Sequence, residues 1–157
     1  MSQVPKRISQ DGLPGSPSIN NNGAIAFLAR TAEASFPEAL VLLRSQGRTE
    51  MLASQGASFS AFGRTSHFFS LILNDLDSVL FLANLAKDAD PGERLDALFF
   101  TTLGQTIPLA VEGVYIHSIG ATISDIRSFA MNNHNQIVLV SKVKRDLMRD
   151  VIFTVTK

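Results

Sequence analysis

The sequence predicts an all-β fold built from repeated antiparallel sheets, and three observations support this. A stretch made of an apolar residue, an Asn, a polar turn and an apolar run occurs at residues 19–29, 73–83 and 131–140. Asn, Asp and Gly favour tight turns because they tolerate positive φ. The run after each turn shows no polar alternation, which is typical of a strand covered on both faces. Nothing in the sequence states what the protein does.

The strands of the first set are expected at residues 24–30, 39–43, 49–53 and 68–73. The second set repeats this pattern, and from the third strand onward the offset is 57 residues. The glycines show this offset most clearly. Three pairs of them are separated by 57 residues: Gly47 and Gly104, Gly56 and Gly113, Gly63 and Gly120.

Two places in the second set need a choice between interpretations. Residues 90–98 could begin a helix, but we interpret them as a loop before a strand, because their counterparts Leu40 and Ile152 lie in β-rich runs. Pro108 lies inside an expected strand and donates no backbone hydrogen bond. That strand is therefore predicted to be an edge strand or to carry a bulge.

The 157 residues are predicted to form one repeat domain with a substantial core. Residues 19–72 are the first repeat, residues 73–130 the second, and residues 131–157 a partial third, with strands at 136–141 and 151–155. A short candidate strand lies at residues 6–9. Four short strands in a period of about 55 residues are typical of a propeller blade. We therefore expect antiparallel β-propeller-like blades, about 2.5–3 four-stranded repeats per chain.

Composition excludes several classes of function. Fourteen basic and fourteen acidic residues cancel, so no net charge directs the chain to nucleic acid. The chain has no Cys, which excludes disulfides and thiolate metal sites. We find no apolar segment of a signal peptide at the start, and no apolar run near the roughly 18 residues of a membrane helix. We expect no nucleic-acid partner and no membrane insertion.

The side chains that could bind a metal are better explained by structural roles. His67, His117 and His134 occupy different places in the repeat, so we do not expect them to converge on one ion. Carboxylates alternate at residues 74–77 and 88–93, as in calcium loops, but neither stretch has the twelve-residue loop with a terminal Glu. Both are predicted to be solvated turns, and the second is where a cation would be sought.

Catalytic and anion-binding patterns are weak as well. No Ser lies in a Gly-x-Ser-x-Gly or Ser-x-x-Lys motif, and no glycine-rich phosphate loop precedes a helix. One basic cluster, expected on a solvated hairpin face, contains Lys142, Lys144, Arg145 and Arg149. We predict no catalytic, cofactor-binding or metal-binding residue, and no cofactor. A glycan-active enzyme would need two carboxylates at one cavity. The candidates for such a pair are Asp75, Asp77, Glu112 and Asp125.

The motif at residues 20–27, Asn-Asx-x-Gly-x-Ile-Ala-Phe, is followed by a Gly-x-Thr…Leu-Ala-x-x-Gly segment. Together they resemble the tandem repeats of bacterial, mostly exported, propeller-type proteins of unassigned function. The resemblance covers nearly the whole chain and implies a propeller fold and an envelope or extracellular setting. The turn Gly is replaced in the second copy, at residues 74–77, and in the third, at residues 134–135. The Trp-Asp and sialidase propeller signatures are missing.

These observations favour a non-catalytic binding or scaffold module with a glycan or protein ligand. The alternatives are a glycan-active hydrolase or lyase with carboxylates in a central channel, and a structural fragment of a larger propeller. Two or three blades cannot close a ring, and an open stack would leave two apolar faces in water. We therefore expect a homo-oligomer, in particular a head-to-tail homodimer. Residues 8–12 match residues 52–56, so residues 4–18 of another chain could complete the third repeat.

Overall fold

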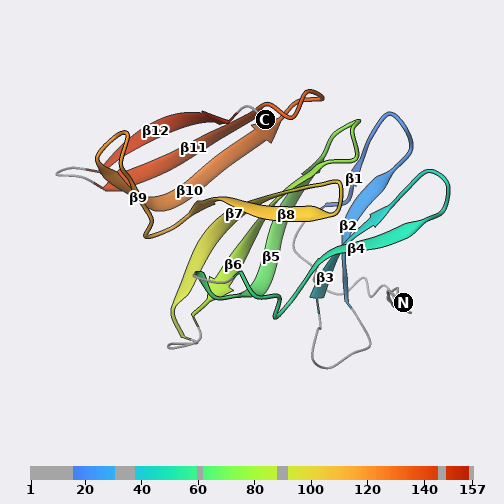
Figure 1. Cartoon of the computed structure of the whole chain (residues 1–157), viewed down its shortest axis with the longest axis horizontal. Coiled ribbons are helices and arrows are strands. Elements are labelled where there is room, and N and C mark those ends of the chain that lie inside the picture. Colours follow the sequence, from blue (N-terminus) through green and yellow to red (C-terminus); the bar gives the residue numbers. More distant parts are fainter. Residues whose placement is uncertain (1–15, 31–37, 60–61, 88–91, 145–147, 156–157) are drawn as a thin grey trace.

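The computed structural model describes residues 16–30, 38–59, 62–87, 92–144 and 148–155. In these residues it contains twelve β-strands and no α-helix. The strands form three four-stranded antiparallel sheets that follow one another along the chain (Figure 1). The predicted all-β class is therefore confirmed.

Each sheet is built from strands that are consecutive in sequence. Sheet A contains β1 (Ser18–Ile19), β2 (Ile25–Arg30), β3 (Glu38–Leu43) and β4 (Thr49–Ser54). Sheet B contains β5 (Arg64–Leu73), β6 (Val79–Ala86), β7 (Arg94–Thr102) and β8 (Gln105–Val111). Sheet C contains β9 (Tyr115–Ile116), β10 (Ala121–Met131), β11 (Ile137–Lys144) and β12 (Met148–Val155).

The pairing registers show which strands are equivalent. The first residue pair after the Asn turn is Ile25–Leu43 in sheet A, Val79–Thr101 in sheet B and Ile137–Val155 in sheet C. Strands β10, β11 and β12 therefore correspond to β5, β6 and β7. Strand β9 has no counterpart in β4 or β8, because it pairs with the opposite edge of the sheet. Within the described residues, sheet C thus lacks the fourth strand of sheets A and B.

Two sequence predictions are corrected by these registers, and one is confirmed. The strand expected at residues 68–73 was assigned to the first set, but it is part of β5, which begins sheet B by pairing with β6. The loop expected over residues 90–98 ends sooner, because Arg94 already pairs with Ala86. Pro108 lies in the edge strand β8, beside a register shift, as predicted.

Two apolar cores lie between the sheets. The core between sheets A and B is rich in Phe, and the rings of Phe81 and Phe99 stack with their centroids 5.1 Å apart. The core between sheets B and C contains Leu80, Leu98 and Phe100. Strands β6 and β7 therefore bury both faces, which explains why their sequences are almost continuously apolar.

The two outer faces of the stack differ. On sheet A the outer face includes Phe27, Ala29 and Val41, and the latter two are at most 1% exposed. The expectation of two apolar faces in water is therefore wrong at this end. On sheet C the exposed fraction is 39% for Val138 and 69% for Ile152. The third copy of the apolar strand was also expected to be buried on both faces. It is not, because among the described strands only those of sheet B pack against sheet C.

Candidate functional site

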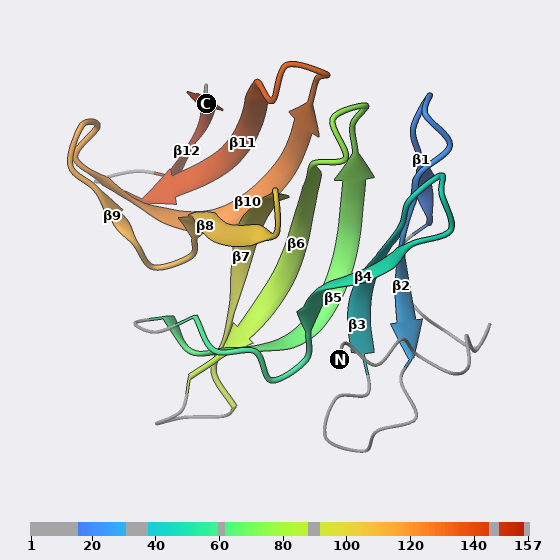
Figure 2. The same cartoon turned by 45° about the vertical axis from the view of Figure 1, so that its right-hand side comes forward.

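The three Asn turns lie at the same end of neighbouring sheets, where each first strand leads into the second (Figure 2). In every turn the Asn Oδ1 accepts two backbone N–H groups, from the residues two and four positions later. The distances are 3.0 and 2.9 Å at Asn20, 3.0 and 3.0 Å at Asn74, and 2.9 and 3.0 Å at Asn132. This is Asx-turn chemistry, as the sequence predicted.

The fourth position of each turn has a left-handed backbone. Its φ is 77° at Gly23, 56° at Asp77 and 58° at Asn135. Asp and Asn are the residues that best tolerate this conformation after Gly. Asp77 and Asn135, which replace the Gly of the repeat motif, therefore preserve the turn.

The Asn side chains also connect the sheets, and we call Asn20, Asn74 and Asn132 the asparagine ladder. The Nδ2 of Asn20 donates to the carbonyl oxygen of Asn74 at 3.0 Å and to Oδ1 of Asp77 at 2.9 Å. The Nδ2 of Asn74 donates in the same way to Asn132 O at 3.0 Å and to Asn135 Oδ1 at 2.7 Å. The replacements of the turn Gly therefore supply acceptors that Gly cannot offer.

Asp75 forms a second connection on the solvent side of the ladder. Its carboxylate accepts hydrogen bonds from the backbone N and Nδ2 of Asn21, at 2.9 and 2.8 Å, and from Nδ2 of Asn133 at 2.6 Å. These bonds, chiefly the side-chain bond from Asn21, lower the pKa of the Asp75 carboxyl. Asp75 is thus an ionised acceptor that joins all three turns.

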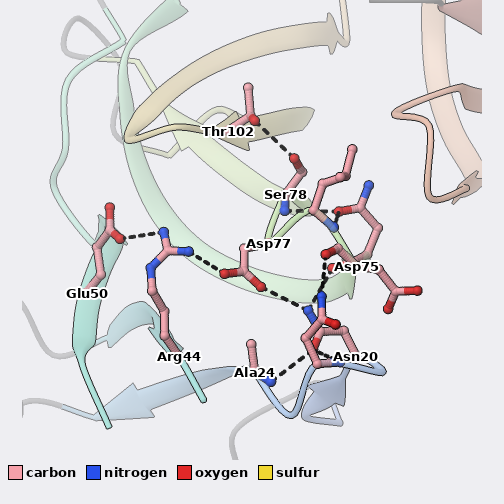
Figure 3. Close-up of polar contacts among 11 residues, drawn as sticks. Asn20, Ala24, Arg44, Glu50, Asp75, Asp77, Ser78 and Thr102 are labelled. Carbon is pink, nitrogen blue, oxygen red and sulfur yellow. Dashed lines mark hydrogen bonds and ion pairs between the residues drawn. The ribbon is translucent and has the colours of Figure 1, made fainter. Parts of the chain in front are cut away.

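The Asp77 carboxylate also forms a hydrogen bond and an ion pair (Figure 3). Besides Asn20, its carboxylate pairs with the guanidinium of Arg44, which follows β3. The other arm of Arg44 lies 3.0 Å from Glu50 on β4, and the Glu50 carboxylate raises the pKa of Arg44. This ion-pair chain fastens the outer strands of sheet A to the turn of sheet B.

The ladder ends at Asn132. Its Oδ1 makes the usual turn bonds, but its Nδ2 donates to Oε1 of Gln136 in the same turn, at 2.6 Å. Asn132 is exposed, whereas Asn20 and Asn74 are buried. The donor that reaches the next sheet in the first two copies therefore bonds within its own turn in the third.

A group of three carboxylates lies at the opposite end of sheets B and C, and we call Asp96, Glu112 and Asp125 the acidic cluster. Glu112 accepts the backbone N–H of Asp96 at 2.9 Å, and Asn84 donates to the Asp96 carboxylate. Burial raises the pKa of both Asp96 and Glu112, and the charge of Asp125 adds to the effect. Asp125 itself pairs with Arg127 at 2.7 Å.

The position between sheets A and B that is equivalent to the acidic cluster contains a carboxylate–histidine pair instead. There Glu38, the counterpart of Asp96, lies 2.8 Å from Nδ1 of His67, the counterpart of Asp125. His117 contacts the ring of Tyr115 instead, with centroids 5.0 Å apart, and His134 lies in the third Asn turn. The structure does not bring the three histidines together.

The remaining sequence candidates are placed as follows. The four carboxylates considered for an enzyme are divided between the two ends: Asp75 and Asp77 in the turns, Glu112 and Asp125 in the acidic cluster. Residues 88–91 and 145–147, together with residues 4–15, lie outside the described residues. Lys142 pairs in register with Asp150. Within the described part of the chain, no group of three or more His, Asp or Glu could hold a metal ion.

An apolar groove of about 360 Å³ lies between sheets B and C, beside β8 and β12. Its walls include Leu98, Pro108, Leu139 and Phe153, and no titratable side chain lines it. The sequence analysis missed this groove, because it depends on two sheets meeting and on β12 being an edge strand among the described residues. An apolar groove beside a strand edge can bind extended polypeptide.

Three successive four-stranded sheets, joined by side-chain ladders at their turns, define an all-β repeat protein. The chain belongs to the family described as "Family of unknown function (DUF7453)", whose model matches residues 8–151. No curated protein and no solved structure matches the chain. The described residues include no helix long and apolar enough to span a membrane. The resemblance to exported propeller repeats stays a prediction.

Proposed function

We propose that the protein is a non-catalytic binding or scaffold module of propeller-type repeats, and that its binding surface is the outer side of sheet C. The carrying observation is the exposure of Val138 and Ile152, at 39% and 69%. Their counterparts in sheet B, Leu80 and Leu98, are fully buried against sheet C. Sheet C thus has apolar side chains at the positions that pack against the next sheet in sheet B, but in sheet C these side chains are exposed.

The edge of β12 supports the same proposal. β12 is the last strand of its sheet, and no described strand pairs with its outer side. Such an edge presents unpaired N–H and C=O groups that an added strand can satisfy. The adjoining groove is apolar, so it suits aliphatic side chains better than sugar hydroxyls. Between the protein and glycan ligands, these features favour a protein segment in extended conformation.

The alternative function, a glycan hydrolase or lyase, has one supporting observation. Glu112 has a raised pKa beside two other carboxylates, as a general acid would. However, the same Glu112 carboxylate already accepts the Asp96 N–H, and Asp75 and Asp77 have structural partners at the other end. These occupied carboxylates favour binding over hydrolysis.

A peptide-display selection on the native protein tests this proposal. We expect the selection to yield extended peptides with alternating apolar residues. Their affinity, measured by calorimetry, should be at least tenfold lower for the Ile152→Lys variant than for the native protein. The matched control is Leu103→Lys, because Leu103 is 94% exposed on the turn between β7 and β8. Selected peptides that bind both variants equally would contradict the proposed surface. Release of reducing sugar from a polysaccharide panel would support the enzyme instead.

A further inference from the structure

We infer that the outer side of sheet C binds the same side of sheet C in a second copy of this chain, so that two copies form a symmetric face-to-face dimer. The inference rests on the proposed function, because it uses the same surface and names its partner. Two adjacent strands carry it, β11 and β12, which pair with each other over their whole described length.

The side chains on the outer side follow from the alternation of the strands. Successive side chains point to opposite faces of a sheet. Ile137, Leu139 and Phe153 belong to the core between sheets B and C. The residues that alternate with them therefore point away from sheet B. Within the described side chains these are Val138, Val140 and Lys142 on β11, and Asp150, Ile152 and Thr154 on β12.

The strand register arranges these six side chains in three rows across the two strands. Val138 pairs with Thr154, Val140 with Ile152, and Lys142 with Asp150. The first row therefore joins a valine to a threonine, the second is apolar on both strands, and the third joins opposite charges. No row contains two like charges.

This surface is complementary to itself. A two-fold axis parallel to the strands, midway between β11 and β12, places β11 of one copy over β12 of the other. Val140 then faces Ile152 of the second copy, and Lys142 faces Asp150 of the second copy. Each contact occurs twice, because the interface is isologous. Sheets commonly pack in this aligned way, about 10 Å apart and with strand directions within about 30° of each other.

Other two-fold arrangements of the same surface are less favourable. An axis that runs along β11 stacks Lys142 on Lys142 of the second copy, which brings like charges together. An axis in the interface across the strands, through the apolar row, places Lys142 over Val138 of the second copy and leaves its charge without a partner. The charges therefore favour one axis, and they favour a partner that presents the same three rows.

Sheet B shows that the apolar row is suited to sheet packing. Leu82 and Leu98 are the counterparts of Val140 and Ile152, and both pack in the core against sheet C. In the second copy the same row would meet an apolar row again. Six side chains from each copy make a small interface, so we expect a reversible dimer that depends on protein concentration.

Charge exchange between copies tests the inference by sedimentation equilibrium. Lys142→Glu and Asp150→Lys each place like charges across the interface, so each variant alone should associate at least tenfold more weakly than the native protein. An equal mixture of the two variants should associate about as well as the native protein, because both contacts between unlike chains again join opposite charges. Repulsion within one chain would persist in the mixture, so the recovery identifies a contact between copies.

The matched control reverses a second ion pair on the same chain. Lys87 Nζ lies 2.8 Å from Glu93 Oε1, on the connection between β6 and β7 of sheet B. Lys87→Glu and Glu93→Lys should leave association unchanged, alone or mixed, and circular dichroism checks that every variant is folded. A native protein that stays at 17.0 kDa at all concentrations overturns the inference. So does a mixture that associates no better than its two components.

The peptide selection separates this inference from the proposed function. A native monomer that binds the selected peptides through Ile152 refutes the second copy and leaves the proposed function standing. A native dimer that is recovered in the mixture, together with peptides that ignore Ile152, supports the second copy and refutes the extended peptide as the ligand of this surface.

Discussion

Replacing Asn74 by Ala should destabilise the protein far more than replacing Asn132, although the two residues hold the same position in the repeat. Asn74 is 3% exposed. Its side chain makes four hydrogen bonds, with the backbone N–H groups of Leu76 and Ser78, with Asn132 O and with Asn135 Oδ1. Two of these bonds form the turn, and two connect sheet B to sheet C.

The expected magnitude follows from these contacts. A buried hydrogen bond contributes about 1 kcal/mol net, and a buried donor left without an acceptor costs about 1–3 kcal/mol. The N–H of Ser78 becomes such a donor, because Ser78 is fully buried. We therefore expect Asn74→Ala to lower the free energy of unfolding by about 3–5 kcal/mol. For Asn132→Ala we expect about 1 kcal/mol, since water can replace its exposed bonds.

Urea unfolding followed by far-ultraviolet circular dichroism measures the difference, as the chain has no Trp. With a slope of about 2 kcal/mol/M, the two midpoints should differ by about 1–2 M. Asn74→Asp provides a second comparison. It retains the Oδ1 acceptor for the turn and replaces the donor to Asn132 with a carboxylate oxygen. Equal midpoints for the two Ala variants would refute the connecting role of the ladder.

Two further predictions concern single positions. Gly63→Ala should cost about 2–4 kcal/mol, because φ is 108° and the new Cβ would lie 2.3 Å from the carbonyl oxygen of Ala86. Gly47→Ala, with φ of 78° and no atom within 4 Å, should cost only about 1 kcal/mol, and similar midpoints would argue against the clash. Burial and the charge of Asp125 raise the pKa of the Asp96 carboxyl in the folded protein. The fold therefore loses stability as the pH rises above the ordinary pKa range of an Asp carboxyl and this group ionises. Asp96→Asn should therefore gain stability over the native protein at pH 7 and gain less at pH 4, and a gain independent of pH would contradict this.

The strands and turns could be predicted because their causes are local. Asn, Asp and Gly appear where the backbone turns, and the left-handed φ of Asp77 and Asn135 follows from the same chemistry. Pro108 was correctly placed at an edge, since its missing N–H acts within its own strand. The strand at β5 was assigned to the wrong sheet because its pairing does not depend on local sequence. Sequence periodicity gives the spacing of the strands, but hydrogen-bond pairing decides which sheet a strand joins.

The candidate sites depended on neighbours that the sequence does not specify. The partners of Asp75 and Asp77 lie on turns 53 or more residues away, or follow β3 in the preceding sheet. The meeting of Asp96 with Asp125 likewise requires sheets B and C to pack. Nothing in the local pattern distinguishes a free carboxylate from one held by a neighbouring sheet.

By itself, therefore, the sequence determined an all-β repeat with three Asn turns and almost continuously apolar second strands. These features follow from backbone preferences and from burial that acts over a few residues. Only the tertiary structure decided that the ladder ends at Asn132 and that Val138 and Ile152 are exposed. Whether an apolar strand is covered depends on the sheet that packs against it, and that sheet is set by the stacking of whole repeats.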